Sequence, residues 1–394
     1  MQDPIVIVSA KRTPMGNFNG IFKDISAPQL GSYAISAALD NFPEHKNKID
    51  QVYMGCVLSA GLGQAPARQA ALGSDLPIST PCTTINKMCG SGMKTVMMAH
   101  HEIQSHNAEI IIAGGMENMS RAPYLLLGAR TGLRMGSQTL EDHMLLDGLL
   151  NAYAERLSMG VLAENCAKEF NLTREQQDAF AIASINRAIQ ATTSGFFKNE
   201  ITSIAIPDKK NNVIMITEDE GIQKANVEKI PQLKPAFVKE GTITAANSSS
   251  ISDGAAALVL MRLSHAQKLK LTPLAKIIAD HTVAQAPEWF STAPIAAIEQ
   301  LLAKISLTVA DIDLFEINEA FAVVTLASMK ALSLPFEKVN VHGGACILGH
   351  PIGASGARIL VTLIHALKQH NKKRGVAALC IGGGEATAMA IEIV

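Results

Sequence analysis

The same order of elements occurs twice in the chain, once in each half. In the first half, an apolar segment at 49–55 and an apolar run at 109–116 enclose a Gly-rich turn and a helical pattern. In the second half, the segments 312–317 and 376–384 enclose the same kind of sequence. Short apolar runs that alternate with helical patterns are typical of βαβ units around buried, largely parallel sheets. The sequence therefore predicts a duplicated α/β fold.

The segment between the two halves differs in texture. It is richer in charge, and it contains an amphipathic helical pattern from Thr173 to Gln190. Thr173 and Gln176 have the spacing of a capping box, which satisfies backbone groups of a first helical turn. An inserted loop domain is the natural interpretation. The predicted domains are an N-terminal half at 1–119 that is completed by 245–271, a loop domain at 120–244, and a C-terminal half at 272–394.

Composition and charge narrow the classes of partner and compartment. The net charge is −1, from 34 Lys and Arg against 35 Asp and Glu, so nothing favours nucleic acid or an anionic membrane as partner. No uninterrupted apolar stretch approaches the roughly 20 residues that span a bilayer. The N-terminal segment resembles a strand rather than a signal peptide. We therefore expect a cytoplasmic protein that binds neither nucleic acid nor membrane.

Cysteine and histidine spacing predicts no metal centre. The six cysteines are scattered without a CxxC pair, which excludes the usual spacing of a disulfide scaffold or a zinc ribbon. His100 and His101, like the other histidines, lack metal-ligand spacing. The glycines at 382–384 form neither a phosphate-binding loop nor a dinucleotide fingerprint. We expect neither a metal nor a bound cofactor.

Cys89 is the first candidate for chemistry. It stands in the segment Asn-Lys-Met-Cys-Gly-Ser-Gly at 86–92, just before a helical pattern that ends near Gln104. A thiol at a helix N-terminus is close to unpaired N–H groups, and we expect them to lower its pKa. Gly90 and Gly92 allow a substrate to approach the backbone closely. By position alone, a buried structural cysteine remains the alternative.

Three further candidates follow strands or glycines in the second half. His350 lies in a turn and helix pattern at 343–368, with five glycines within fourteen residues, a density that favours a constrained turn near a ligand. Cys380 ends an apolar strand, and strand ends are where open α/β sheets place their sites. Asn318 follows another strand and opens a helical pattern that runs to Leu332. Asn318 is either a helix cap or an oxyanion donor.

Four segments together resemble the active-site motifs of the thiolase family, and the resemblance covers essentially the whole chain in order. They lie at 86–92, 318–322, 349–358 and 380–384. Within the family, the chain is most similar to short-chain members that act on acetoacetyl-CoA. The resemblance implies two similar βαβαβαββ halves in a five-layered αβαβα core, with a loop domain that covers the coenzyme A site. It also implies a homotetramer, built as a dimer of dimers, in the cytoplasm.

The resemblance assigns a role to each candidate. Cys89 matches the nucleophile that accepts the acyl group, and His350 would take its proton. Cys380 would remove the α-proton of a second acetyl-CoA, and a water on Asn318, together with His350, would hold the enolate oxygen. The backbone N–H groups of Cys89 and Gly382 would form a second oxyanion hole. The implied reaction is the reversible condensation of two acetyl-CoA to acetoacetyl-CoA and CoA by ping-pong kinetics, with coenzyme A thioesters as substrates and no cofactor.

The resemblance also suggests residues that contact coenzyme A. Ser249 would lie near the pantetheine, and the tunnel would be lined by Met159, Phe237, Ala320 and Phe321. Simple core packing is the alternative for the apolar members of this set.

Two positions near the expected coenzyme A site depart from the family pattern. Ser158 stands where short-chain members commonly have His, and Gln223 stands where many relatives have an Arg that contacts the nucleotide.

Three other functions compete with a short-chain thiolase. A degradative thiolase for longer 3-oxoacyl chains shares the motifs, and the substitution at Ser158 leaves chain length open. A non-catalytic acyl-CoA-binding relative should have lost a reactive side chain, whereas this chain retains all four. A decarboxylating ketosynthase needs a second His where Asn318 stands.

Overall fold

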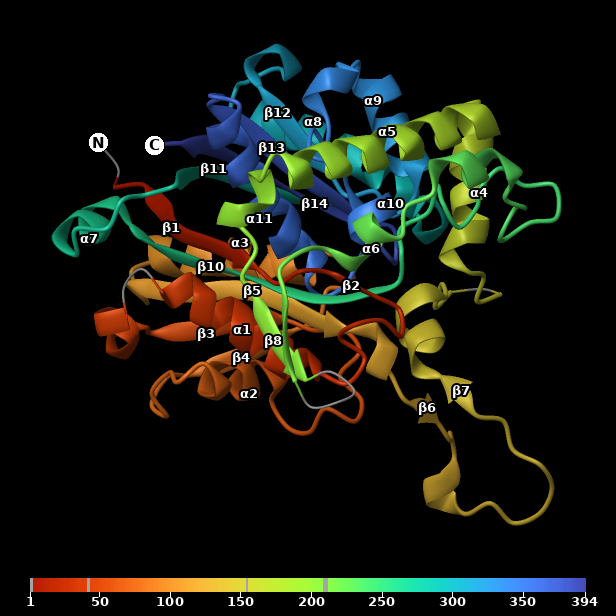
Figure 1. The fold of residues 1–394 in the computed structure, drawn as a ribbon, viewed down its shortest axis with the longest axis horizontal. Helices are drawn as coiled ribbons and strands as arrows, with labels where there is room; N and C mark the ends of the chain where they lie inside the picture. The colour runs from red at the N-terminus through yellow and green to blue at the C-terminus, as the bar shows by residue number, and fades with distance from the viewer. Residues whose placement is uncertain (1–2, 41–42, 154, 208–211) are drawn as a thin grey trace.

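A large mixed sheet forms the centre of the protein (Figure 1). The computed structural model describes residues 3–40, 43–153, 155–207 and 212–394. The strands follow the order β12-β13-β14-β11-β1-β10-β5-β3-β4, and β2 pairs with β10. Their bounds are β1 (Ile5–Arg12), β2 (Gly16–Asn17), β3 (Gln51–Gly55), β4 (Cys82–Ile85), β5 (Ile110–Asn118), β10 (Ser252–Arg262), β11 (Ala275–Ala284), β12 (Leu314–Ile317), β13 (Arg374–Ile381) and β14 (Glu385–Ile393).

The order of the strands confirms the duplication. In the first half β1, β3, β4, β5 and β10 alternate with α1 (Ala27–Leu39), α2 (Pro66–Gly73) and α3 (Ser91–Gln104). In the second half β11, β12, β13 and β14 occupy the places of β1, β3, β5 and β10. They alternate with α8 (Ala293–Lys304), α9 (Ala322–Leu332), α10 (Ala345–Leu348) and α11 (Ser355–Gln369). The counterpart of β4 is reduced to a single bridge between Phe315 and Val339.

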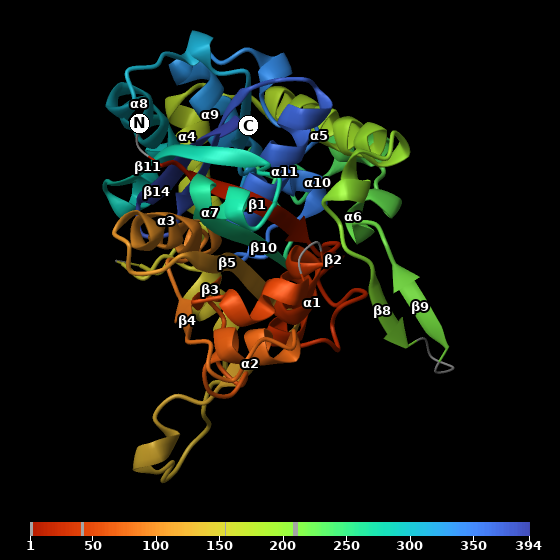
Figure 2. The same cartoon turned by 90° about the vertical axis from the view of Figure 1, so that its left-hand side faces the viewer.

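The strands bury both faces, which produces the predicted five layers (Figure 2). Ile111 of β5 faces a core that includes α3 and α11, whereas its neighbour Ile112 faces α1 and α2. In the second half, Leu379 of β13 faces the same middle core, and Ala378 faces α8. This alternation follows from the two-residue period of a strand. The layers are therefore α1 and α2, the strands of the first half, α3 and α11, the strands of the second half, and α8 with α9.

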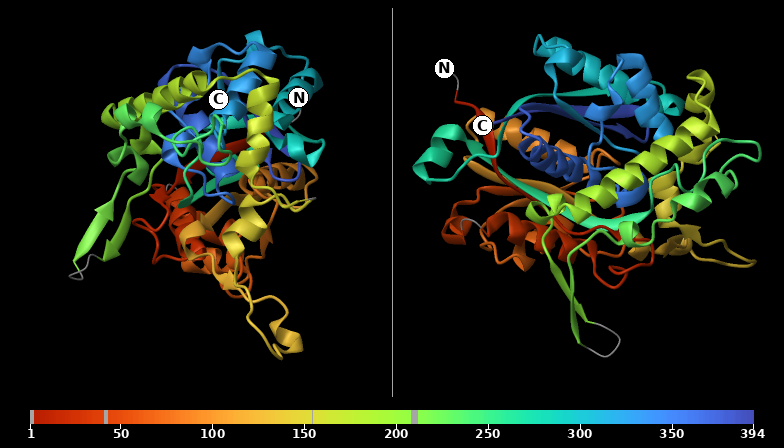
Figure 3. Two further views of the ribbon diagram at one scale, coloured as in Figure 1. Left: turned by 90° about the vertical axis from the view of Figure 1, so that its right-hand side faces the viewer. Right: turned by 45° about the horizontal axis from the view of Figure 1, so that its top comes forward.

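The segment between β5 and β10 lies over one end of these layers. It contains β6 (Tyr124–Leu125), β7 (Glu141–Asp142), α4 (Met159–Glu169), α5 (Arg174–Thr193), β8 (Ile204–Pro207), β9 (Val213–Ile216) and α6 (Glu220–Gln223). Thr173 caps α5, and its capping box with Gln176 is confirmed. Two hairpins, β6–β7 and β8–β9, stand away from the body (Figure 3). The limits of this segment as a separate domain remain a prediction.

Short elements complete the chain. The helix α7 (Leu263–Lys268) joins the two halves. The 3₁₀ and π turns are η1 (Pro43–Lys48), η2 (Met119–Arg121), η3 (Ala129–Thr131), η4 (Leu145–Leu149), η5 (Phe196–Asn199), η6 (Val227–Gln232), η7 (Pro287–Thr292), η8 (Val309–Asp311) and η9 (Phe336–Lys338). Among the described residues, we find no helix with the length and apolar character needed to cross a membrane.

Two predicted helices are shorter than the sequence pattern suggests. The helix expected from Asn318 begins at Ala322. The residues before it are held extended, because the backbone N–H of Ala322 donates to the carbonyl of Asn247 (2.8 Å) and Phe321 forms a β-bridge with Ser248. The pattern at 343–368 is interrupted after Gly349, whose φ of 98° ends α10. Both interruptions hold candidate side chains in loops rather than in helices.

Candidate active site

A tight turn presents Cys89 at the start of α3. Met88 has a φ of 47°, a left-handed conformation that is strained for a side chain of this size. Ser91 holds the turn: its hydroxyl accepts from the backbone N–H of Lys87 (2.8 Å) and donates to the carbonyl of Met88 (2.6 Å). Cys89 therefore lies one residue before the N-cap of the helix, on a turn whose shape is fixed by neighbouring hydrogen bonds.

The turn between β13 and β14 brings Cys380 and Gly382 to the same place. Gly383 and Gly384 have φ angles of 94° and 84°, which favour glycine. A Cβ atom on Gly90 would lie 2.4 Å from Cδ1 of Ile381, so the turn packs directly against the turn of Cys89. The backbone N–H groups of Gly382 and of Cys89 itself lie close enough to the sulfur of Cys89 to lower its pKa. Residues from the two halves thus share one site.

Burial keeps both thiols protonated in the substrate-free protein. Burial raises the pKa of Cys89 to about 11, although the N–H groups of Gly382 and Cys89 lower it. The expectation of a lowered pKa is therefore wrong, because loss of water outweighs the helix terminus. Burial also raises the pKa of Cys380 well above its usual range, and the charge of nearby Cys89 adds to the rise.

His350 follows the break between α10 and α11, and it is held as a neutral base. Nδ1 lies 2.5 Å from the hydroxyl oxygen of Ser355, whose hydrogen is donated to the carbonyl of Pro351 (3.0 Å). Both contacts of Ser355 are satisfied when Nδ1 carries the imidazole proton, and that tautomer leaves a lone pair on Nε2. Among the described residues, buried Nε2 has no hydrogen-bond partner. Burial, together with the charge of Arg358, lowers the pKa of His350 to about 3.

Asn318 joins this group from the end of β12. Its backbone N–H donates to the carbonyl of Ala378 (3.0 Å), which places it beside the strand that ends at Cys380. Its side-chain Nδ2 lies 3.4 Å from Nδ1 of His350. Oδ1 is buried without a hydrogen-bond partner in the described part of the chain, so the amide retains capacity for a water or a substrate.

A cavity of about 780 Å³ leads to His350. Ser158, Met159, Phe237, Ser249 and Phe321 line it, and these are residues that the family resemblance assigns to coenzyme A binding. Phe237 stands edge-on to Phe321 with ring centroids 5.9 Å apart. The cavity is also lined by residues that sequence reasoning did not single out: Asn17, Met119, Leu149, Lys229 and Ile352.

Comparisons with known proteins match this chain along almost its full length. The sequence model of the thiolase N-terminal domain matches residues 5–264, and that of the thiolase C-terminal domain matches residues 271–393. The chain belongs to the thiolase family.

Several named proteins are similar to this thiolase over nearly their whole length. Acetyl-CoA acetyltransferase of Cupriavidus necator is 48% identical over 98% of the chain and 99% of the relative. Acetyl-CoA acetyltransferase 2 of Arabidopsis thaliana is 49% identical over 99% of the chain and 97% of the relative. The crystal structure of the Acat5 thiolase from Ascaris suum in complex with coenzyme A has a TM-score of 0.93 at 42% identity, and the match covers 99% of this chain and 100% of that one.

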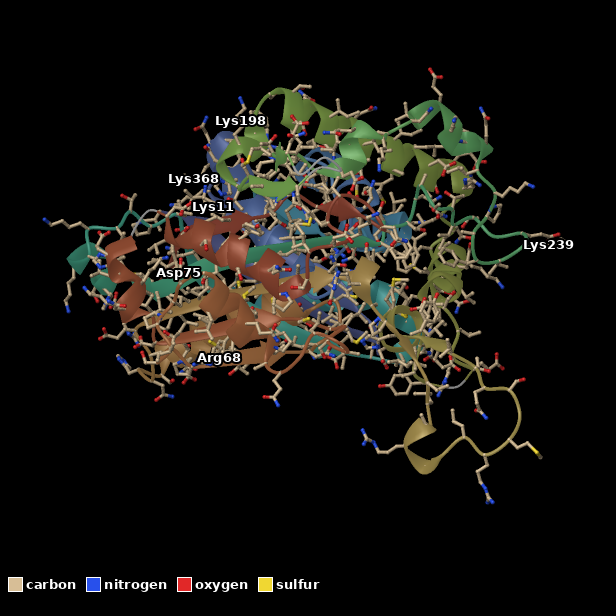
Figure 4. All side chains as sticks on the ribbon, turned by 60° about the horizontal axis from the view of Figure 1, so that its bottom comes forward. Lys11, Arg68, Asp75, Lys198, Lys239 and Lys368 are labelled. Atoms are coloured by element: carbon tan, nitrogen blue, oxygen red, sulfur yellow. The ribbon has the colours of Figure 1, made fainter. Side chains whose placement is uncertain are left out.

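Two predicted coenzyme A contacts lie outside the set of described residues that line the cavity of this thiolase. Ala320 is buried, and its carbonyl accepts from the backbone N–H of Ser249 (3.0 Å), so it acts through a residue that does line the cavity. Gln223 ends α6, but the next residue, Lys224, reaches the cavity and forms an ion pair with Glu220 (2.5 Å). Lys239 points away from the body (Figure 4).

Two buried carboxylates, to which sequence reasoning gave no role, hold the loops of this thiolase. Glu117 accepts from the backbone N–H groups of Val57 (2.9 Å), Leu58 (3.1 Å) and Gly353 (2.9 Å), and so ties the loop of His350 to the loop after β3. Burial raises its pKa to about 7, against the lowering by these three N–H groups.

Glu319 has the corresponding position after Asn318. It accepts from Ser184 (2.8 Å), Asn340 (2.9 Å) and the backbone N–H of Cys346 (3.0 Å). The sequence signal that could have revealed Glu117 and Glu319 is the position of each: a Glu within a motif whose neighbours are mostly apolar. Such a residue is buried only when it is paired.

Proposed function

We propose that this thiolase is an acetyl-CoA acetyltransferase, which condenses two acetyl-CoA to acetoacetyl-CoA and CoA and also catalyses the reverse cleavage. The observation that carries the proposal is the contact between the turn of Cys89 and the strand end and turn that hold Cys380 and Gly382, where a Cβ on Gly90 would lie 2.4 Å from Cδ1 of Ile381. A condensation through a covalent intermediate needs one group to hold the acyl chain and another to move a proton. The names of the similar proteins from Cupriavidus necator and Arabidopsis thaliana support the choice of substrate.

The first half-reaction begins at His350. Because the pKa of Cys89 is raised to about 11 by burial, the nucleophile needs a base, and Nε2 of His350 offers a free lone pair. The Cys89 sulfur then attacks the thioester carbonyl. The N–H groups of Cys89 and Gly382, which lie close to the resting sulfur, would hold the oxygen of the tetrahedral intermediate. Removal of one such donor typically lowers kcat by about 10²–10³-fold. The bond to the CoA sulfur breaks and leaves acetyl-Cys89.

The raised pKa of Cys380 dictates how protons move in the second half-reaction. Its thiol must first lose a proton, and the departing CoA sulfur is the group that gains one. The Cys380 thiolate then removes the α-proton of the second acetyl-CoA, while Asn318 and His350 stabilise the enolate oxygen. The enolate attacks acetyl-Cys89, and the Cys89 sulfur recovers its proton from His350. Over the cycle all three groups return to their starting state, with no need for a metal or an electron carrier.

A thiolysis assay tests the substrate. The rate with free CoA is measured on acetoacetyl-CoA and on 3-oxooctanoyl-CoA. We expect the higher kcat/KM on acetoacetyl-CoA, because Phe290 stands edge-on to Phe321 (6.3 Å) in the apolar cluster around Cys380 and limits the room for a longer chain. A preference for 3-oxooctanoyl-CoA would instead indicate a degradative long-chain thiolase. Coenzyme A binding without turnover would indicate a non-catalytic relative.

The further proposal for assembly is a homotetramer. The arm at 126–140, between β6 and β7, supports it, because Leu127 is 55% and Met135 is 94% exposed. Apolar side chains this exposed are typical of interaction surfaces. Light scattering after gel filtration tests the oligomeric state, and a monomer would contradict the proposal.

We also propose a cytoplasmic location, which imaging of the tagged protein in its cell tests.

A further inference from the structure

Two histidines and an aspartate meet at the junction of the two halves, remote from the active site. His100 and His101 lie near the end of α3, and Asp280 lies in the middle of β11. Nδ1 of His100 and Nε2 of His101 are each 3.0 Å from the same carboxylate atom, Oδ2 of Asp280. One ligand atom from each residue can be chosen so that all three lie within 4.8 Å of one another. We propose that these three residues bind one divalent transition-metal ion, of which Zn²⁺ is the best fit.

The donor set suits that class of ion. Two imidazole nitrogens and one carboxylate oxygen favour Zn²⁺, Co²⁺ or Ni²⁺ over Mg²⁺ or Ca²⁺, which prefer oxygen alone. Ligands at about 2.0–2.1 Å around a tetrahedral ion are roughly 3.4 Å apart. The two separations at Asp280 are 3.0 Å, and all three ligand atoms lie within 4.8 Å of one another, so rotation of these side chains would bring them to the spacing that an ion requires.

Burial and charge complete the site. His100 and Asp280 are buried, whereas the side chain of His101 is 54% exposed, so the fourth position is open to water. The positive charge of Lys304 in α8 would repel the ion. It lies close to the site, because Nζ donates to the backbone carbonyl of Asp280 (3.1 Å).

The position indicates a structural role. Helix α3 belongs to the first half and β11 to the second, so a bound ion would join the two halves of the fold. His101 lies ten residues after Ser91, about 15 Å along the helix from its first turn, so the ion would not contact the catalytic thiols. Sequence spacing could not reveal this site, because adjacent histidines lack ligand spacing and the third ligand is 180 residues away from His100.

Metal titration of the full chain tests the proposal. Chelator-treated protein is titrated with Co²⁺ and with Zn²⁺ by calorimetry, and the Co²⁺ complex is followed by visible absorption. We expect one ion per chain and a higher Tm in its presence, since a ligand that binds only the folded state stabilises it. His101→Ala should weaken binding by at least about tenfold and abolish the rise in Tm, without changing thiolysis. His106→Ala, an exposed histidine just after α3, is the matched control and should bind as the wild type does.

Three outcomes would overturn the proposal. The first is no stoichiometric binding. The second is equal binding by the wild type and His101→Ala. The third is a Co²⁺ spectrum with a thiolate charge-transfer band, which would place the ion on cysteines such as Cys89 instead.

Discussion

Nδ1 of His350 lies 2.5 Å from the hydroxyl oxygen of Ser355, and the hydroxyl in turn donates to the carbonyl of Pro351. This pair fixes the imidazole tautomer that leaves Nε2 free as a base. In Ser355→Ala the Nδ1 proton loses its acceptor, and the tautomer with a proton on Nε2 becomes populated. We expect kcat for thiolysis to fall about 10–100-fold with little change in KM. Ser328→Ala, which removes a buried hydroxyl bound to its own helix, is the control and should keep kcat.

Gly90 allows the two active-site turns to touch. Its φ of −81° suits alanine, so any effect of Gly90→Ala is steric: the new Cβ would lie 2.4 Å from Cδ1 of Ile381. We expect the turn of Gly382 to shift away from Cys89 and kcat to fall on the order of 100-fold, with a small change in Tm.

A second substitution distinguishes this account from general damage. Ile381→Val removes Cδ1, so the double variant Gly90→Ala with Ile381→Val should recover much of the lost kcat. If the double variant is no faster than Gly90→Ala alone, contact between these turns does not set the oxyanion geometry.

The pKa of Glu117, which burial raises to about 7 from 4.5, makes stability depend on pH. The folded protein holds the proton more tightly than the unfolded chain. This contribution is therefore complete below about pH 4.5 and is lost as pH rises through about 7. The free energy of unfolding should fall by up to about 1.4 kcal/mol per pH unit in this window.

Glu117→Gln isolates that effect, because it removes the titrating group and keeps one acceptor. Denaturant unfolding at about pH 5 and about pH 8 should show a smaller loss of stability for the variant than for the wild type. An equal loss in the free energy of unfolding for the two proteins would show that another buried acid controls the dependence of stability on pH.

Lys229 lines the cavity, where its ammonium can meet the phosphates of coenzyme A, whereas Gln223 is not among the described residues that line it. In Lys229→Met we expect a several-fold higher KM for coenzyme A and a weaker dependence of KM on salt, since exposed charges are screened by ions. Gln223→Ala should leave both quantities unchanged. Initial rates at varied salt test this pair, and a larger effect at Gln223 would place the nucleotide differently.

Most of the fold was predictable, because its signals are local. The alternation of strands and helices predicted the duplication, and Thr173 with Gln176 predicted the start of α5. The starts of the helices after Asn318 and Gly349 were not predictable, because contacts with distant residues such as Asn247 hold those segments extended. Tertiary hydrogen bonds overrode local helical pattern at both places.

The motif residues of the site were recognisable, but their environment was not. Helix position suggested a lowered pKa for Cys89, and burial reverses it. Burial depends on packing from both halves, which no local pattern reports. The roles of Glu117 and Glu319 were missed for the same reason: their partners come from loops that are far apart in sequence.

The central claim is a division of labour in which Cys89 holds the acyl group and Cys380 moves a proton. The most direct test is mass spectrometry of the intact protein and its peptides after incubation with acetyl-CoA. We predict one acetyl group on Cys89 in the wild type and in Cys380→Ser, none in Cys89→Ala, and loss of condensation in both variants. An acetyl group on another residue, or an equal loss of labelling in Cys380→Ser and Cys89→Ala, would contradict the account.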